Sequence, residues 1–301
     1  MSSPRQILCP IDFSPLSERS LKLAIEVCRR LGARLVLEHN LETPPPTGLA
    51  VGWMWSEEHE AKGKDEGARA VRRLEQVFER IPDDVDYEAK ITRGPLDEGI
   101  LHLARSLPAE MIVMGTHGPS NARHQSVTEK TIMRAPCPVL STGERYDPGA
   151  VFGLADGPEP QELSFLIPFD FSRRSRAALD YGLETARRMP HRVHILHVAQ
   201  RPPQPVEAPP MPVPIDEIAS RVQGLVPDDL SDRVEVRVLV GDPVRRIVEE
   251  AARTQALFVL LAAHGKSAFK RLLFGTRTLE ILHGCECPVW FLPPAALRAG
   301  A

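Results

Sequence analysis

Short apolar segments alternate with longer amphipathic segments along most of the chain. The segment Ser17–Leu31 carries its apolar residues at the spacing of one helical face, with Ser14 or Ser17 as its expected N-cap and Gly32 as its expected end. Segments such as Met111–Met114 are apolar throughout, which is typical of strands buried on both faces of a sheet. Strands that alternate with helices predict a parallel sheet with helices on both faces.

The predicted strands form two sets of five. In the first half they are Ile7–Ile11, Arg34–Glu38, Tyr87–Thr92, Met111–Met114 and Val139–Ser141. In the second half they are Ser164–Phe169, Val193–His197, Val234–Val240, Leu257–Leu261 and Val289–Leu292. Further helices are expected at Ser175–Arg188, Pro243–Thr254 and Thr276–Leu282.

The two halves repeat one another. The segment ILCPIDFS places Asp12 directly after the first predicted strand of the first half. FLIPFDFS places Asp170 in the same way in the second half, 158 positions later (170 − 12). MIVMGTHG is answered by FVLLAAHG, and APCPVL by CECPVW. A period of about 150 residues is the size of a domain, not of a solenoid repeat. We therefore expect two tandem domains, 1–145 and 163–295, joined by a linker at 146–162.

Composition narrows the class of protein. A length of 301 residues accommodates two domains of ordinary size, and a net charge of −3 disfavours nucleic acid as a partner. Five cysteines are few for such a chain, which favours free thiols in a reducing cytoplasm. The first residues lack the apolar core of a signal peptide, and the apolar run Ala256–Ala263 is too short to span a membrane. We expect a cytoplasmic protein without a membrane partner.

Candidate chemistry gathers where the strands end. In a doubly wound sheet of strand order 3-2-1-4-5, the ends of strands one and four border one crevice, where such folds bind ligands. Asp12 and Asp170 follow the first strand of each half, and the turns GTHG and AAHG follow the fourth. A carboxylate can accept from amino or hydroxyl groups, and backbone N–H groups at a helix start can bind phosphate. This combination suits a nucleotide.

These motifs resemble the universal stress protein family. The resemblance rests on P-x-D-x-S after strand one, G-x-x-G after strand four, the G-[ST] that follows it, and the closing A-P-C-P-V segment; it covers nearly the whole chain. It implies an α/β fold of two doubly wound, five-stranded, Rossmann-like domains of order 3-2-1-4-5. It also implies a stress-response or regulatory role, with ATP or a related adenine nucleotide as ligand and Mg²⁺ as an optional companion. ATP-binding members of the family carry G-x2-G-x9-G-[ST].

The first half departs from that pattern. It keeps Gly115 and Gly118, but Gln125 stands where the last glycine is expected, ahead of a matching Ser-Val pair. The offset between halves grows from 147 (265 − 118) to 150 (287 − 137), so this loop is three residues shorter. A shortened loop with a side chain at a close approach is a poor phosphate cradle. The weaker set of candidate ligand contacts is Ile11, Asp12, Gly115, Gly118, Ser126 and Val127.

The second half keeps the spacing and is the preferred nucleotide site. Ala262 replaces the first glycine, which adds one methyl group, and the loop carries cations that could meet phosphates. Val198 matches the apolar adenine contact implied by the resemblance, whereas the first half has Asn40 there. The predicted ligand contacts are Pro168, Phe169, Asp170, Val198, Leu261, Ala262, His264, Gly265, Lys266, Gly275, Thr276 and Arg277.

Structural interpretations compete with these assignments. The two aspartates could simply cap the helices that follow them. A C-x-C pair at Cys285 and Cys287 lacks a second ligand pair and is expected to be buried and structural. His117 and His264 are expected to be loop residues without a catalytic role. LLAAHGKS lacks the first glycine of a phosphate-binding Walker loop.

The alternative function is an interaction or scaffold protein that does not bind nucleotide. Residues 201–214 contain seven prolines, and Trp53 and Trp55 lie among polar residues; both segments could dock an unknown protein partner. The signature of a nucleotide-using transferase is missing, so we expect no enzyme, and at most slow ATP hydrolysis. By resemblance, Val139–Ser141 and Val289–Leu292 would pair within the chain as a pseudo-dimer, which could associate further into a homodimer.

Overall fold

The structure is a computed structural model that describes residues 5–41, 57–107, 109–116, 122–148, 163–200, 212–263 and 276–299. Its contacts divide the chain into two compact units, Met1–Val139 and Leu140–Ala301, so that the division falls inside strand β5. The predicted domain boundaries themselves stay a prediction.

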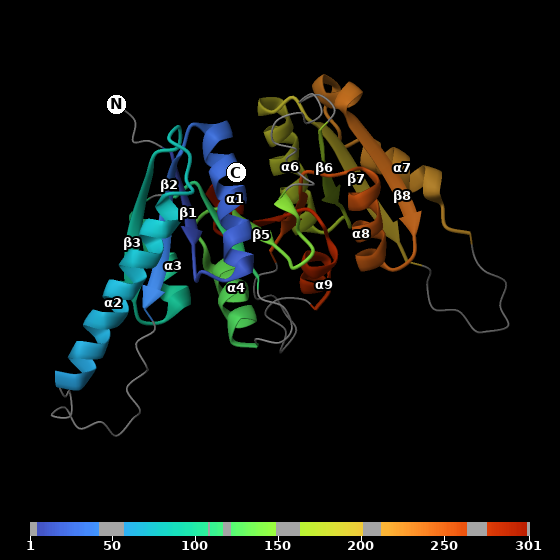
Figure 1. Ribbon diagram of the computed structural model, residues 1–301. Helices are drawn as coiled ribbons and strands as arrows, with labels where there is room; N and C mark the ends of the chain where they lie inside the picture. The colour runs from blue at the N-terminus through green and yellow to red at the C-terminus, as the bar shows by residue number, and fades with distance from the viewer. Residues whose placement is uncertain are drawn as a thin grey trace. The chain divides into compact units, whose positions relative to one another are not determined.

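Strands and helices alternate along the first half of the sequence (Figure 1). The elements are β1 (Gln6–Pro10), α1 (Pro15–Leu31), β2 (Arg34–Leu41), α2 (Glu57–Phe78), β3 (Tyr87–Arg93), α3 (Leu96–Ser106), β4 (Met111–Gly115), α4 (Ala122–Arg134) and β5 (Val139–Thr142).

The second half repeats this order and adds a 3-10 helix, η1, before its third strand. The elements are β6 (Ser164–Pro168), α6 (Arg173–Arg188), β7 (Arg192–Ala199), α7 (Ile215–Gln223), η1 (Asp228–Arg233), β8 (Val234–Val240), α8 (Pro243–Arg253), β9 (Val259–Ala262), α9 (Thr276–Gly284), β10 (Val289–Leu292) and α10 (Ala296–Ala299).

The strand order is the one predicted. Along the first half it is β3-β2-β1-β4-β5, and along the second it is β8-β7-β6-β9-β10, both of which are 3-2-1-4-5. The pairs β1–β2, β1–β4 and β2–β3 are parallel, as are β6–β7, β6–β9 and β7–β8. Right-handed crossovers place α1 and α2 on one face and α3 and α4 on the other, and α3 contacts α4. The predicted fold class is confirmed.

The central strands are buried on both faces. Ile7, Leu8 and Val113 in the first unit have no exposed surface, and neither does Val259 in the second. Glu38 in β2 is equally inaccessible, although its carboxyl group is a poor fit for such a position. A fully buried carboxyl group in a strand therefore needs an explanation.

Serine caps start the first helix of each unit. Ser14 accepts a hydrogen bond from the Ser17 backbone N–H at 3.2 Å, and Ser172 accepts one from Ser175 at 3.1 Å. Helix α1 ends at Gly32, whose φ of 59° lies in the left-handed region that glycine adopts without strain. Of the two expected N-caps, Ser14 is the one observed.

Two strands, β8 and β10, have the predicted bounds, and the ends of the others differ from the prediction by at most three residues. The fourth strand of the second unit begins at Val259, not at Leu257, although the Leu257 backbone N–H donates to the Ser164 carbonyl at 2.7 Å. The first strand of this unit ends at Pro168, one residue before Phe169, because the chain turns there toward α6. Element ends fray in this way whenever the ladder of hydrogen bonds gives way to a turn.

Replacing either cap should destabilise the protein measurably. We expect Ser14→Ala and Ser172→Ala each to lower the free energy of unfolding by about 1 kcal/mol, since each leaves a helix N–H without its acceptor. Urea denaturation followed by circular dichroism measures this. The matched control is Ser220→Ala, whose hydroxyl donates to the Asp216 carbonyl inside α7. Equal effects at the caps and at this control would contradict the assignment.

Candidate functional site

A tight turn joins the first strand of each unit to its first helix. Asp12 Oδ1 accepts a hydrogen bond from the Ser14 backbone N–H at 2.9 Å, and Asp170 Oδ1 accepts one from Ser172 at 3.0 Å. The N-caps are the serines, so the interpretation of the aspartates as helix caps is wrong. Each aspartate instead fixes the turn at the carboxyl end of its strand, where α/β proteins place ligands.

The residue between aspartate and serine has an unusual backbone conformation. Phe13 and Phe171 both have φ of 61°, which costs a non-glycine residue about 1–2 kcal/mol. The ring centroid of Phe13 lies 4.6 Å from that of His39, and Phe171 repeats this contact with His197 at 5.0 Å. The strained conformation places each aromatic ring against the histidine of the neighbouring strand.

An arginine lies over each of these rings. The guanidinium carbon of Arg73, on α2, lies 4.2 Å from the Phe13 ring centroid, and that of Arg221, on α7, lies 4.7 Å from the Phe171 ring centroid. Cation–π contacts of this kind contribute about 0.5–1 kcal/mol at exposed sites. Sequence reasoning missed this repeated cluster of arginine, phenylalanine and histidine, because its members come from three separate parts of the chain.

The histidines are held by the backbone of the preceding strand. His39 Nδ1 lies 2.8 Å from the Ile11 carbonyl oxygen, and His197 Nδ1 lies 2.8 Å from the Phe169 carbonyl oxygen. A carbonyl only accepts, so Nδ1 carries the proton in both contacts. The backbone N–H of Ile11 also donates to the Glu38 carbonyl at 2.7 Å. The backbone carbonyls of Ile11 and Phe169 thus fix the orientation of the two histidine rings.

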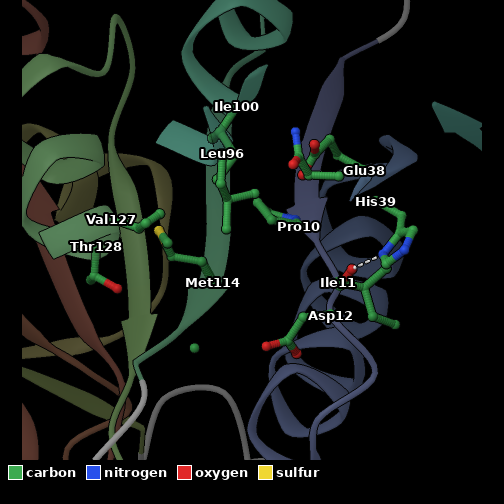
Figure 2. A pocket seen from close by; sticks show the side chains of 12 residues that line it. Pro10, Ile11, Asp12, Glu38, His39, Leu96, Ile100, Met114, Val127 and Thr128 are labelled. Atoms are coloured by element: carbon green, nitrogen blue, oxygen red, sulfur yellow. Dashed lines mark hydrogen bonds between the residues drawn. The ribbon is translucent and has the colours of Figure 1, made fainter. Parts of the chain in front are cut away.

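The first unit contains a cavity of about 220 Å³ at the carboxyl ends of β1, β2 and β4. Figure 2 shows Leu96 and Ile100 of α3 facing Pro10 and Glu38, with Asp12 at the opposite end. The structure brings four of the predicted first-half residues to this cavity: Ile11, Asp12, Gly115 and Val127. It also adds residues that were not predicted as ligand contacts: Pro10, Glu38, His39, Asn40, Leu96, Ile100, Met114 and Thr128.

Three polar side chains form a chain of hydrogen bonds beside this cavity. Asn40 Nδ2 donates to Thr92 Oγ1 at 2.8 Å, and Thr92 Oγ1 donates in turn to Glu38 Oε1. Burial raises the pKa of the Glu38 carboxyl to about 7, although the hydrogen bond from Thr92 opposes the rise. Among the residues that the structure describes, Glu38 Oε2 and Asn40 Oδ1 are buried without a hydrogen-bond partner.

Gly115 has a packing role that the family pattern does not reveal. A Cβ atom there would lie 2.9 Å from Ser20 Oγ and 3.1 Å from the Leu16 carbonyl oxygen, both on α1. Its φ is not positive, so no left-handed conformation demands glycine. In the second unit Ala262 occupies the corresponding place at the end of β9. The φ of Ala262 is not positive, so alanine is accommodated there without backbone strain.

A second cavity, of about 240 Å³, also involves His39 and Asn40. Its other lining residues are Phe13, Leu41, Arg69, Ala70 and Arg73. The two arginines make this cavity basic, whereas Asp12 and Glu38 line the first one.

The second unit is described in part. The ends of β6, β7 and β9 are adjacent, because β6 pairs with both neighbours. They carry Pro168, Phe169, Val198, Leu261 and Ala262, with Asp170 exposed just beyond β6 and Arg277 exposed on α9. The predicted contacts His264, Gly265, Lys266 and Gly275 lie outside the described residues, as do Gly118 and the side chains of Ser126 and Thr276.

The cysteines belong to the core. All five are buried as free thiols, which confirms the structural interpretation of Cys285 and Cys287. Burial raises the pKa of the Cys28 and Cys137 thiols to about 12.

Across the described ranges, no group of three or more histidine, cysteine, aspartate or glutamate side chains is placed to hold a metal ion. Nor does any helix in those ranges combine the length and apolarity needed to cross a membrane.

Comparison with known proteins agrees with this geometry. The family model described as "Universal stress protein family" matches residues 4–142 and again residues 164–293. The chain therefore belongs to the universal stress protein family, with two copies of its domain, and the resemblance found in the sequence is confirmed.

Relatives and solved structures give the same result. A universal stress protein of Methanocaldococcus jannaschii is 28% identical over 139 residues, which cover 45% of this chain and 80% of the relative. One from Thermus aquaticus is 31% identical over 139 residues, covering 45% of this chain and 96% of the relative. A crystal structure of a universal stress protein from Archaeoglobus fulgidus has a TM-score of 0.62 at 14% identity, with 96% of each chain covered. At that identity the last comparison concerns the fold alone.

The buried glutamate should make stability depend on pH. A carboxyl with a pKa of about 7 when folded, against an ordinary value of 4.5, binds its proton more tightly in the folded state. The shift therefore adds no pH-dependent cost below about pH 4.5 and destabilises the protein increasingly as pH rises to about 7. We expect Glu38→Gln to raise the free energy of unfolding at pH 8 by about 2–3 kcal/mol.

Urea denaturation of wild type and Glu38→Gln at pH 4 and pH 8 tests this. The pH 4 comparison is the internal control, because the carboxyl is then largely protonated in both the folded and the unfolded protein and the two variants should nearly coincide. A pH-independent difference between them would show that Glu38 does not titrate as described.

Proposed function

We propose that this protein is a regulatory, nucleotide-binding member of the universal stress protein family. The proposed ligand is ATP or a related adenine nucleotide, bound mainly by the second unit and optionally accompanied by Mg²⁺. Asp170 and Val198 would hold the ribose and base, and Gly265, Gly275 and Thr276 would surround the phosphates with backbone N–H groups.

The observation that carries this proposal is the meeting of the ends of β6, β7 and β9, which are adjacent because β6 pairs with both neighbours. Asp170 is exposed there, and its carboxylate is anchored by the hydrogen bond to the Ser172 backbone N–H. Such a carboxylate is oriented before the ligand arrives, so it can accept from a ribose hydroxyl at little entropic cost.

The half-buried Val198 favours an apolar, flat group next to that carboxylate. Its counterpart in the first unit is the polar Asn40, so the two crevices differ at the position of the implied adenine contact. The retained spacing from Gly265 to Gly275 supports phosphate binding in the same unit, and the cations Lys266 and Arg277 add charge complementarity.

We infer a binding function without efficient catalysis. His197 is held through Nδ1 by the Phe169 carbonyl, in a contact that positions the crevice backbone. In the described part of the second unit, the cysteines are buried, so no accessible thiol nucleophile lies beside this histidine. We expect any hydrolysis of ATP to be slow.

An interaction or scaffold role is the second candidate. It is favoured by the changes in both phosphate loops, namely Gln125 in the first and Ala262 in the second. The proline-rich residues 201–214 and the residues Trp53 and Trp55 would then contact the partner; most of these lie outside the described residues. Pairing of the last strands as a pseudo-dimer, and any further homodimer, stay predictions.

Calorimetry on protein purified without added nucleotide tests the main proposal. The sample is denatured first, to identify any small molecule that it carried through purification. We then expect ATP to bind at one site per chain with a dissociation constant near micromolar, about −8 kcal/mol. Gly275→Gln and Asp170→Ala should each abolish this heat of binding.

Asp12→Ala is the matched control, because Asp12 holds the equivalent turn in the first unit. It should leave the ATP isotherm unchanged. If ATP gave no heat at high concentration and no ligand co-purified, nucleotide binding by the second unit would be refuted. The interaction role would then be the better account.

A further inference from the structure

The two units differ in chemistry at three structurally equivalent positions. Two of these positions lie in the second strand of each unit, and the third lies in the strand paired with it, as the registers of β2–β3 and β7–β8 show. The first unit has polar residues at all three, and the second has apolar residues. The pairs are Glu38 and Leu196, Asn40 and Val198, and Thr92 and Leu239.

The polar set in the first unit is internally connected but incomplete. Thr92 uses its hydroxyl both to accept from Asn40 Nδ2 and to donate to Glu38 Oε1. Two acceptor atoms, Glu38 Oε2 and Asn40 Oδ1, are left buried without a partner among the described residues. Buried acceptors without donors cost stability, so this set points to a missing donor.

Helix α3 closes one side of this set. A Cβ atom at Gly99 would lie 2.8 Å from Thr92 Oγ1 and 3.4 Å from Asn40 Nδ2, so the helix backbone packs directly on these groups. The other side is the cavity, which both Glu38 and Asn40 line. In Figure 2 the Glu38 side chain extends from β2 toward the wall formed by Leu96 and Ile100. The missing donor can therefore come from a molecule in the cavity.

The cavity limits the size and shape of that molecule. Its volume of about 220 Å³ is below the usual range of about 300–1,000 Å³ for drug-sized ligands. Leu96, Ile100 and Met114 provide apolar walls suited to a flat ring. Asp12 at the opposite end leaves a polar exit for the rest of a larger ligand.

We propose that the first unit binds a purine that presents two adjacent N–H donors, as guanine does, to Glu38 Oε2 and Asn40 Oδ1. Guanine carries an N1–H and a 2-amino group side by side, which matches two acceptors. Adenine pairs one donor with the acceptor N1, and so would oppose one acceptor with another. This site is separate from the adenine-nucleotide site proposed in the second unit.

Protonation of Glu38 should make the affinity for the purine depend on pH. Donors from guanine stabilise the ionised carboxylate, whose pKa without ligand is about 7, so binding releases a proton at lower pH. Titratable or charged groups also lie on the elements that pack around β2. Cys9 and Asp12 come from β1 and the turn after it, His39 follows Glu38 on β2, and Lys90 is the β3 partner of Glu38. Asp97 on α3 pairs with Lys130 on α4. Burial raises the pKa of the Cys9 thiol, so this thiol stays neutral across the range of interest.

Calorimetry with GMP, IMP and AMP tests the proposal, because the three probes share a ribose phosphate and differ in the base. At pH 8 we expect GMP to bind at least about tenfold more tightly than IMP, which lacks the 2-amino donor, and more tightly than AMP. The GMP affinity should fall about tenfold per unit as pH drops below 7. Titrations in two buffers with different ionisation heats should show proton release on binding.

Two variants connect the binding to the polar set. Glu38→Gln keeps the size of the side chain and should abolish the preference for GMP over AMP. The triple variant Glu38→Leu, Asn40→Val, Thr92→Leu carries the residues of the second unit and should do the same; circular dichroism verifies its fold. Gly275→Gln should remove ATP binding and leave GMP binding intact, which separates failure at one site from failure at the other.

Equal affinity for GMP and AMP in the wild type would overturn the proposal. So would a preference for GMP over AMP that survives in Glu38→Gln, or GMP binding that strengthens as pH falls from 7 to 6. The last result would mean that the protonated carboxyl donates to the ligand, as it would to N1 of adenine.

Discussion

Burial of a parallel sheet on both faces is the constraint on which the rest of this structure depends. Strands such as those containing Ile7 and Val259 have apolar side chains on both sides because helices cover both faces. Polar chemistry is then confined to the strand ends, where the chain turns into a helix. Both candidate sites lie at these ends, next to a turn of aspartate, phenylalanine and serine that recurs in the two units.

Glu38 breaks this constraint, and the structure shows how it is accommodated. Its carboxyl is inaccessible to solvent, its pKa is raised by burial, and one oxygen is hydrogen-bonded by Thr92. The equivalent position in the second unit is Leu196, which needs no such support. The two units thus share the turn at the strand ends and differ in the polarity of the buried residues beside it.

The sequence carried enough information for the fold. Alternating apolar and amphipathic segments, the repeat of Asp12 at Asp170, and Gly32 after α1 are local signals with direct physical causes. The polar set beside the cavity could not be found in this way, because Thr92 is 54 positions from Glu38 and meets it only through the register of β2 and β3. A single glutamate in the segment LVLEHN was the available signal.

The left-handed phenylalanines were beyond sequence reasoning for another reason. Glycine is the residue expected at such a backbone conformation, and Phe13 and Phe171 adopt it because the contacts with histidine and arginine compensate the strain. Gly115 is the converse case, since its glycine reflects the close approach of α1 and not a special φ. Residue type alone does not distinguish these two causes.

The arginine contacts have a consequence for how the chain can vary. Arg73 and Arg221 fix the helix after the second strand to the turn after the first strand, in both units. These contacts act through side chains, outside the hydrogen-bond ladder of the sheet. Loss of an arginine would therefore loosen the helix from the turn and leave the pairing of the strands in place.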